Sequence, residues 1–255
     1  MNFIKKNDLF LLEELVRKNF FSKYKDSVLG IVWTILNPLL MTILFTIIFS
    51  TVFGRNIGNF PVYFLSARCI YEFFNRGISI AMTSIKGNKN ILQRTAAPKY
   101  IFVLGSIFSE FITFIIYLIL LFGVMIVTHA QFYLTIPLAI IPIFSLIIMT
   151  IGLGLMLSIT CVYYTDVQHL WYVFSVMLLY ASALFYPMDI IPEPYHKYMI
   201  LNPLFWIIDQ FRCFIYVGTI PDLLNIVNSL LLSTIILVCG IIVYKKYEKK
   251  VAMRF

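Results

Sequence analysis

The sequence has 255 residues, of which 61% are hydrophobic and only 13% are charged, and its formal net charge is +8. Soluble globular domains are about 45–50% apolar and about 25% charged, so this chain has more apolar side chains than a water-soluble core of its size can bury. A lipid bilayer is the solvent that can accept the remainder. Segments that cross a bilayer are helices or closed barrels, because lipid offers no partner to the backbone polar groups.

The first recognisable element is an amphipathic segment over residues 8–25. Leu9, Leu12, Val16 and Phe20 form an apolar stripe with Leu15 beside it, and the charged residues lie largely on the other faces. This pattern predicts a helix that lies in the plane of the membrane surface. A simple lipid anchor and a docking element for a partner protein fit the pattern equally well.

Six continuous apolar regions follow, and each approaches or exceeds the roughly 20 residues that a membrane-spanning helix needs. They cover residues 30–53, 62–85, 101–128, 134–162, 168–188 and 223–244. Their hydrophobicity does not alternate as it does in the strands of a barrel. We therefore predict an all-α integral membrane protein with one transmembrane domain over 1–255.

Residues 189–222 are apolar in patches but are interrupted by four prolines. This composition is too broken for a span and too apolar for a solvated loop. We predict a re-entrant segment of two short helices, near 194–201 and 203–217, between the fifth and sixth spans. Backbone of this kind is tolerated at membrane depth where protein or a watery cavity covers it.

The distribution of Lys and Arg predicts the orientation of the spans. Fifteen of the 20 basic residues fall on one side of the predicted membrane, three fall on the other, and Arg68 and Arg76 lie within the second region. The basic side is cytoplasmic by the positive-inside rule. Both termini are therefore expected in the cytoplasm. The same clustering at span ends favours membrane topology over nucleic-acid binding as the reason for the net charge.

Motifs for catalysis are missing from the sequence. It contains no GxxxxGK[ST] phosphate-binding loop, HExxH metal motif or GxSxG nucleophile motif. The four cysteines have no metal-like spacing and are expected to pack as small apolar residues. We expect no catalytic residue, no cofactor and no metal site in this chain, which leaves little support for a membrane-bound transferase.

Charged residues within the apolar regions are costly and therefore informative. Arg68, Glu72 and Arg76 are spaced so that all three lie on one face of a helix, where Glu72 can pair with either arginine. They form either a structural ion ladder or a polar strip that faces water or an anionic head group. Glu110 lies within the third region, where it is either paired with a base on another helix or protonated.

Aromatic residues are abundant, with 24 Phe, 16 Tyr and 3 Trp. One set falls at the ends of the first and fifth regions that are expected to face outward, and it includes three residues that share one helical face. These residues are Phe45, Phe49, Phe53, Tyr180, Phe185 and Tyr186. Packing against lipid and lining a path for sugar rings both remain open for this set.

Three motifs together resemble the polysaccharide-export permeases of the ABC type-2 exporter family. KYKDSVLGIVWTILNPLL at 23–40 resembles the family's join between the interface helix and the first span. ILQRTAAPKYIF at 91–102 is similar to its cytoplasmic loop. FYPMDIIP at 185–192 and LNPLFWIIDQFR at 201–212 are similar to its re-entrant segment. The order and spacing of the motifs match over nearly the whole chain.

The resemblance implies a homodimeric permease in the cytoplasmic membrane of a prokaryote, with two copies of a separate ATPase subunit that binds ATP and Mg. The expected substrate is an undecaprenyl-linked glycan such as O-antigen or teichoic acid, and the aromatic set would line its path. The residues expected to contact the ATPase are Lys23, Tyr24, Lys89, Arg94, Lys99 and Asp166. Arg68, Arg76 and Arg212 are candidates to hold the lipid phosphate. An exporter of a small hydrophobic compound or drug is the alternative within the same fold.

Overall fold

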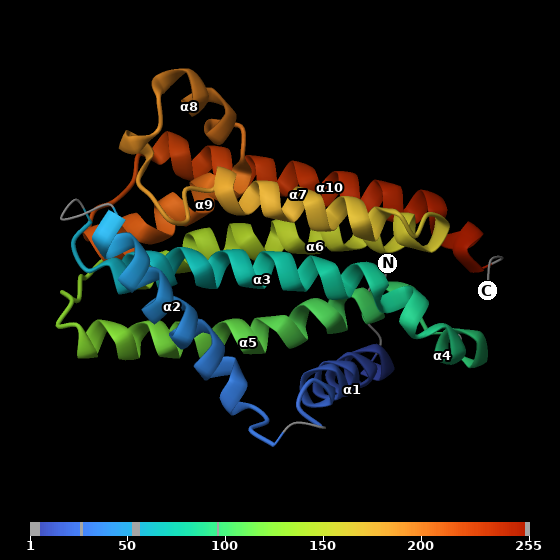
Figure 1. Cartoon of the computed structure of the whole chain (residues 1–255). Coiled ribbons are helices and arrows are strands. Elements are labelled where there is room, and N and C mark those ends of the chain that lie inside the picture. Colours follow the sequence, from blue (N-terminus) through green and yellow to red (C-terminus); the bar gives the residue numbers. More distant parts are fainter. Residues whose placement is uncertain (1–5, 26–27, 53–56, 96, 253–255) are drawn as a thin grey trace.

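The computed structural model describes residues 6–25, 28–52, 57–95 and 97–252, and within them it contains helices and no strand. Four long helices run side by side as a bundle (Figure 1): α3 (Phe60–Gly87), α5 (Lys99–Val127), α6 (Ile140–Tyr163) and α10 (Leu223–Ala252). The C-terminus lies at the end of the bundle that also carries the short α4 (Lys89–Arg94), and α8 and α9 lie at the opposite end.

Four segments are long and apolar enough to cross a membrane. They are Val32–Phe49 within α2 (Val32–Val52), α5, Ile136–Tyr163 and Leu223–Glu248. Ile136–Tyr163 consists of a 3-10 turn (Ile136–Ala139) and α6. The all-α membrane fold is thus as predicted, whereas the count of six spans stays a prediction.

The other two predicted spans have different characters. α3 has 28 residues and lies among the long helices, but it carries the charged residues of the second region. α7 (Val167–Ala181) is apolar but has only 15 residues. The fifth region was therefore predicted too long at its C-terminal end, because the chain turns at Ser182 rather than at residue 188. The last helix runs on past residue 244 to Ala252, with a basic C-terminal end.

The most extensive helix contact in the bundle joins α6 and α10, and glycines make this contact possible. A Cβ atom added at Gly240 would lie 2.2 Å from the backbone oxygen of Gly152. One added at Gly152 would lie 2.6 Å from Leu237 Cα. Small residues let membrane helices approach backbone to backbone, and dispersion contacts then hold them without a hydrophobic driving force. We refer to this contact as the glycine seam.

The amphipathic helix α1 (Lys6–Ser22) packs along α5. Its buried face is centred on Leu15, which is only 4% exposed and contacts Ile101 and Phe102. Phe20 of the predicted stripe is also buried and Leu12 and Val16 are half-buried, whereas Leu9 is 53% exposed. The difference arises because α1 has a protein neighbour: Gly105 of α5 admits Leu15, whose Cβ would be 2.9 Å from an added Cβ.

α2 crosses the bundle at a steep angle and diverges from it toward its N-terminal end (Figure 1). Only 17% of its residues 32–49 are buried. α7 is similar, because most of its large apolar side chains are exposed, including Leu170, Tyr172, Phe174 and Met177. Both helices therefore present apolar faces that the bundle does not cover.

The segment after α7 forms a small lobe at the end of the bundle. It consists of a 3-10 turn (Met188–Ile190), α8 (Glu193–Ile200), α9 (Pro203–Arg212) and a π-helical turn (Cys213–Val217). These bounds match the two short helices expected within 189–222. Asn202 caps the N-terminus of α9, since its side chain accepts a hydrogen bond from the Leu204 backbone N–H at 3.0 Å.

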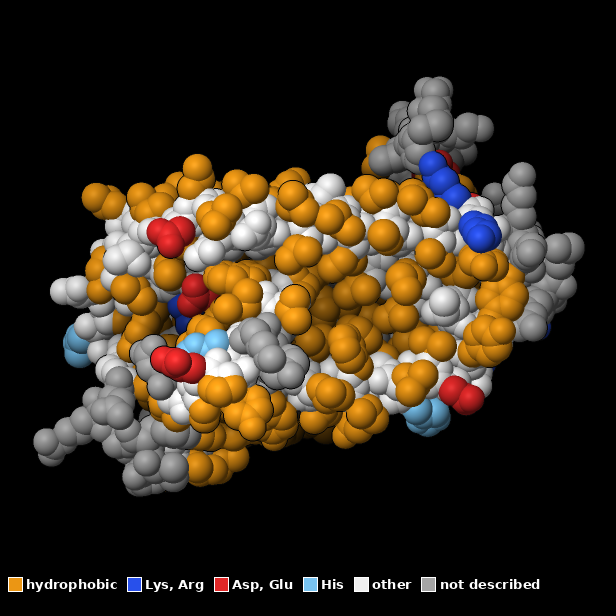
Figure 2. All heavy atoms as spheres, turned by 90° about the horizontal axis from the view of Figure 1, so that it is seen from above, with side chains coloured by type: hydrophobic (Ala, Val, Ile, Leu, Met, Phe, Trp, Pro, Cys, Tyr) orange, Lys and Arg blue, Asp and Glu red, His pale blue; other side chains and the backbone are white. Residues whose placement is uncertain are grey.

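Figure 2 shows one long face of the molecule with side chains coloured by type. Hydrophobic side chains cover the middle of this face, and the visible charged side chains gather toward its two ends. Exposed apolar surface of this extent is unusual for a soluble protein. This distribution is expected of a protein whose middle part is surrounded by lipid.

Candidate functional site

The charged residues of α3 form a ladder along the helix. Glu72 is the central member, and its two carboxylate oxygens are shared between two arginines. Arg76 donates from Nε to Glu72 Oε2 at 2.8 Å, and Arg68 pairs with Oε1 through Nη2. The ladder has one positive charge in excess. The Arg76 side chain is 44% exposed, so its remaining N–H donors are accessible.

A second ion pair joins the turn after α1 to α5. Lys23 Nζ lies 2.5 Å from Glu110 Oε1 and 3.4 Å from Thr113 Oγ1. Glu110 is 2% exposed, and a buried charge is costly unless an opposite charge pairs with it, as Lys23 does here. Of the two possibilities left open for Glu110, the structure favours pairing with a base.

Lys23, Arg76 and Glu110 share one cavity, which we call the elbow cavity because it lies inside the bend between α1 and α2. Its volume is about 430 Å³. The wall is completed by polar and aromatic side chains: Tyr24, Trp33, Thr34, Asn37, Ile80 and Tyr117. Tyr24 and Thr34 hold the bend together through a hydrogen bond of 2.5 Å between their hydroxyl oxygens. With the ladder included, the cavity has a net positive charge.

Arg212 lies at the other end of the molecule and is not arranged as an anion site. Its guanidinium is 7% exposed and donates to three backbone carbonyls: those of Tyr63, Ala183 and Leu184. It also stacks on the Tyr63 ring, at 3.6 Å from the centroid. The expectation that Arg212 holds a lipid phosphate is therefore corrected. This residue ties the lobe to α3 and to the turn after α7.

The aromatic set forms a cluster between α2, α3 and the turn after α7. Phe45 lies 5.0 Å from both Phe64 and Phe185, and Phe49 stacks on Phe185 at 5.6 Å. Tyr180 joins through Phe185 at 5.9 Å. The Tyr186 hydroxyl donates to the Tyr180 carbonyl at 2.6 Å. Phe53 lies outside the described residues.

Phe60 and Phe64 belong to this aromatic cluster, although the sequence did not single them out. Phe49 stacks on Phe60 at 5.7 Å, and Phe60 stacks on Phe64 at 6.1 Å. Phe60 and Phe64 are four positions apart, as are Phe45 and Phe49, so a repeated aromatic spacing on two helices was the available signal. Phe60, Phe64 and Phe185 are buried, whereas Tyr180 is 56% exposed.

The residues expected to contact an ATPase fall into two groups. Lys89 and Arg94 on α4 and Asp166 before α7 are exposed at one end of the molecule. Lys99 lies at the same end but donates to the Glu248 carbonyl at 3.3 Å. Lys23 and Tyr24 turn inward to the elbow cavity, as described above. Of the six residues, only Lys89, Arg94 and Asp166 are exposed together at that end.

In the described part of the chain, no three His, Cys, Asp or Glu side chains are close enough together to hold a metal ion. Asp and Glu are scarce in the elbow cavity, and the carboxylate that lines it is paired with Lys23. The arrangement is suited to binding an anion at the cavity and apolar or sugar surfaces at the aromatic cluster.

Known proteins are similar to this chain over most of its length. The sequence profile of the ABC-2 type transporter family matches residues 11–216. The chain is 24% identical over 247 residues to the O-antigen export system permease protein RfbA of Klebsiella pneumoniae, which covers 95% of this chain and 93% of the relative.

Two further relatives extend the comparison. RfbA of Myxococcus xanthus is 23% identical over 83% of this chain and 82% of its own length. The polysialic acid transport protein KpsM of Escherichia coli is 23% identical over 94% of this chain and 92% of its own length. The profile match covers all of the helices from α2 to α9, and it includes the charged ladder of α3, the Lys23–Glu110 pair and the aromatic cluster. The chain belongs to the ABC-2 type transporter family.

Proposed function

We propose that this chain is the membrane-spanning permease subunit of an ATP-driven exporter of lipid-linked polysaccharide. The observation that carries the proposal is its similarity, over most of their lengths, to permeases whose names state export of O-antigen and transport of polysialic acid. The family membership accounts for the fold, and these relatives indicate the class of substrate. ATP and Mg are bound by a separate ATPase subunit in this proposal, since this chain has no phosphate-binding loop.

The working unit is a homodimer. α2 and α7 support this part of the proposal, because their apolar faces lie next to the aromatic cluster and are left uncovered by the bundle. Two copies that meet along these helices would enclose a path with Phe45, Phe49 and Tyr180 near its wall. Sugar rings have apolar CH faces that stack on such side chains, while their hydroxyls remain hydrated.

The ATPase, in two copies, docks at the end that carries α4. Lys89, Arg94 and Asp166 are exposed there, and α1 lies close by along α5. Positive charge concentrated at this end also supports its assignment to the cytoplasm, with both termini on that side. Nucleotide-driven movement of the ATPase would reach the membrane through α4, α1 and the turn before α7.

The elbow cavity receives the phosphate of the lipid carrier. Arg76 supplies guanidinium donors that Glu72 does not occupy, and Arg68 and Lys23 add positive charge around it. Guanidinium groups bind phosphate oxygens through strong, charge-assisted hydrogen bonds. The N-terminal part of α2, which diverges from the bundle, forms one side of the cavity, so a head group could enter there while its chain stays in lipid.

Depletion of the gene tests the proposed function. Surface glycan should disappear, and lipid-linked precursor should accumulate inside the cell, as measured by extraction and carbohydrate analysis of both fractions. Re-expression of the native chain should restore the surface glycan. Normal surface glycan after depletion, with retention of a hydrophobic compound instead, would favour a small-molecule exporter of the same fold.

A charge reversal at Arg68 provides a finer test. Arg68→Glu should abolish export while the protein remains in the membrane and still associates with its ATPase. Normal export by this variant would remove Arg68 from the phosphate site. Co-purification of the two subunits is the control for assembly.

A further inference from the structure

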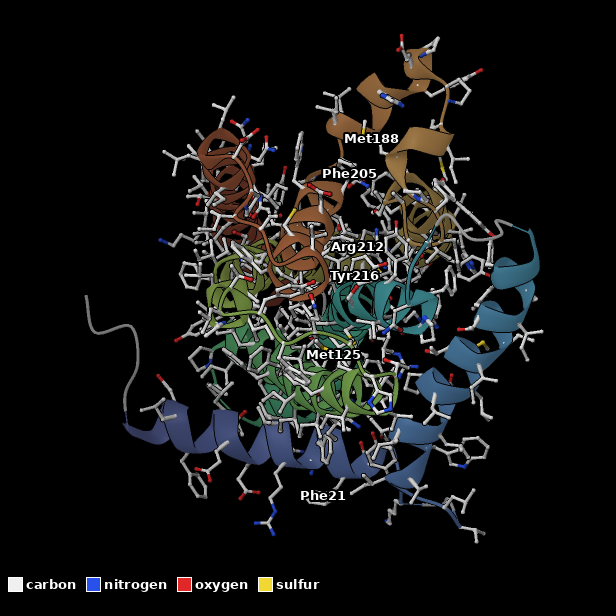
Figure 3. The ribbon with its side chains drawn as sticks, turned by 90° about the vertical axis from the view of Figure 1, so that its left-hand side faces the viewer. Phe21, Met125, Met188, Phe205, Arg212 and Tyr216 are labelled. Carbon is white, nitrogen blue, oxygen red and sulfur yellow. The ribbon has the colours of Figure 1, made fainter. Side chains whose placement is uncertain are left out.

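A second cavity lies in the lobe, at the far end of the bundle from the elbow cavity. Its volume is about 430 Å³, which is within the range of roughly 300–1,000 Å³ typical of small-ligand sites. We call it the α9 cavity. Its lining comes from α3, the turn after α7, α9 and the π-helical turn. Figure 3 views this end directly, with Met188, Phe205, Arg212 and Tyr216 following one another from the lobe toward the bundle.

Aromatic rings held in fixed positions form much of the wall. Tyr63 lies between Arg212, which stacks on its ring, and Tyr216, whose ring centroid is 5.6 Å away in an edge-on arrangement. The Tyr216 hydroxyl donates to the Gly58 carbonyl, and Trp206 Nε1 donates to the Ile200 carbonyl at 2.8 Å. Because these contacts fix the rings in advance, a ligand would not have to order them.

Asp209 brings a carboxylate to this aromatic wall. Within the described residues, the carboxylate has no hydrogen bond and no ion pair. Burial raises the pKa of Asp209, and the positive charge of Arg212 opposes that rise. Arg212 is occupied by the backbone carbonyls already described. The side chain is half-buried in the cavity wall, so its carboxylate can accept hydrogen bonds from a ligand there.

The charge of the site selects the kind of ligand. Asp209 and Arg212 cancel, so neither a cation nor an anion is favoured overall. A neutral ligand with hydroxyl donors and an apolar face fits both the carboxylate and the rings. A sugar unit has these properties: its hydroxyls donate to Asp209, and its CH face packs on an aromatic side chain.

We propose that the α9 cavity is a glycan-binding site, which holds one short stretch of the exported polysaccharide at the end of the molecule opposite the ATPase. This inference rests on the proposed function for the identity of the ligand. It concerns a set of residues separate from the aromatic cluster and from the elbow cavity.

The test uses the full chain with its partner ATPase in lipid nanodiscs. The probe is a fluorescently labelled oligosaccharide, prepared from the surface polysaccharide of the cells that produce this chain, and binding is measured by fluorescence anisotropy. The native complex should bind the probe. Asp209→Asn keeps the size of the side chain and removes its charge, and we expect it to weaken binding about tenfold, the loss of one hydrogen bond to a charged acceptor.

Two further variants make the result specific. Asp222→Asn is the matched control, since Asp222 is an exposed residue outside the cavity on the same end of the molecule and should leave affinity unchanged. Met188→Trp narrows the cavity without changing Asp209 and should also weaken binding. Each variant must assemble with the ATPase in the native yield. If one of the two cavity variants, Asp209→Asn or Met188→Trp, fails to assemble, the other is used for the comparison.

The outcomes separate this site from the function on which it rests. Native affinity in both cavity variants, or no binding of the oligosaccharide by the native complex, would overturn the proposed binding site. The proposed function would still stand if depletion of the gene abolished surface glycan. Binding of a labelled polyamine in place of the oligosaccharide would overturn it as well. Unchanged surface glycan after depletion would instead contradict the proposed function.

Discussion

Helices pack in two opposite ways in this molecule. They are in close contact at the glycine seam between α6 and α10, and they are separated by a cavity at the junction of α1, α2, α3 and α5. At the seam, backbones touch through Gly152 and Gly240. At the junction, an open cavity separates the helices, and the paired charges of Lys23 and Glu110 bridge part of it. Both regions lie within one bundle in the same lipid, so the solvent alone does not explain the difference.

The difference is explained if the two regions have different duties. Backbone contact leaves no room for helices to slide, which suits a fixed scaffold. Charges within a membrane protein are costly and mark places where ligands or moving elements act. We infer that α6 and α10 hold the bundle while α1 and α2 respond to the ATPase and to the lipid head group. The predictions below test this division.

The largest expected effect is the loss of the buried ion pair. Lys23→Met leaves Glu110 buried without its partner and should lower the free energy of unfolding by about 3–5 kcal/mol. The double variant Lys23→Met with Glu110→Met removes both charges and should regain most of that loss. Thermal unfolding in detergent measures both. A double variant as unstable as the single one would show that the pair does not act as a unit.

A methyl group at the seam should have the next largest effect. In Gly240→Ala, the new Cβ would overlap the backbone of Gly152, and overpacking of this kind typically costs about 1–3 kcal/mol. Gly123→Ala is the matched control, because an added Cβ there meets no atom within 4 Å. The control should unfold at or above the native temperature. Equal stability of the two variants would contradict the close approach of α6 and α10.

In the ladder, removing the charge of the partly exposed Arg76 should affect transport more than stability. Arg76→Gln keeps a hydrogen-bond donor near Glu72 but loses the charge-assisted contact to phosphate. We expect about a tenfold loss of export, with the unfolding temperature nearly unchanged, because Arg76 is half exposed. Surface glycan and thermal unfolding are measured on the same variant. If the unfolding temperature fell together with export, the result would indicate that the ladder has a purely structural role.

The smallest effect is expected at the surface of α4. Lys89→Ser and Arg94→Ser should each weaken association with the ATPase only a few-fold, since exposed ion pairs contribute about 0.2–1 kcal/mol. The effect should diminish at high salt. Pull-down of the ATPase at two salt concentrations checks this. Unchanged association in the double variant would place the docking surface elsewhere.

The fold was largely predictable because long apolar runs and proline interruptions act locally. Asn202 and Pro203 between two apolar stretches marked the boundary of α8 and α9 in the lobe. The end of α7 was not predictable, since the apolar run continues past Ala181 and a tertiary contact, the Asn202 amide donating to the Ala181 carbonyl at 3.2 Å, marks the turn there.

The site was harder to predict because its pairs join distant segments. The spacing of Arg68, Glu72 and Arg76 lies within one helix and could be read directly. The partner of Glu110 comes from 87 positions earlier in the chain, and no local pattern identifies it. Arg212 was misassigned for the same reason. From the sequence, an arginine in an apolar segment is interpreted as a functional charge. The structure shows that Arg212 is bound by backbone carbonyls and has a structural role.

The central claim is that this chain forms the route, and that a separate ATPase drives the substrate through it. The most direct measurement uses proteoliposomes that contain the chain and its ATPase, with lipid-linked glycan initially exposed outside on the ATPase side. Addition of ATP should move the glycan into the lumen, where it is protected from an added glycosidase, and omission of the ATPase or of ATP should prevent this. Protection that develops without ATP, or in vesicles without this chain, would contradict the account.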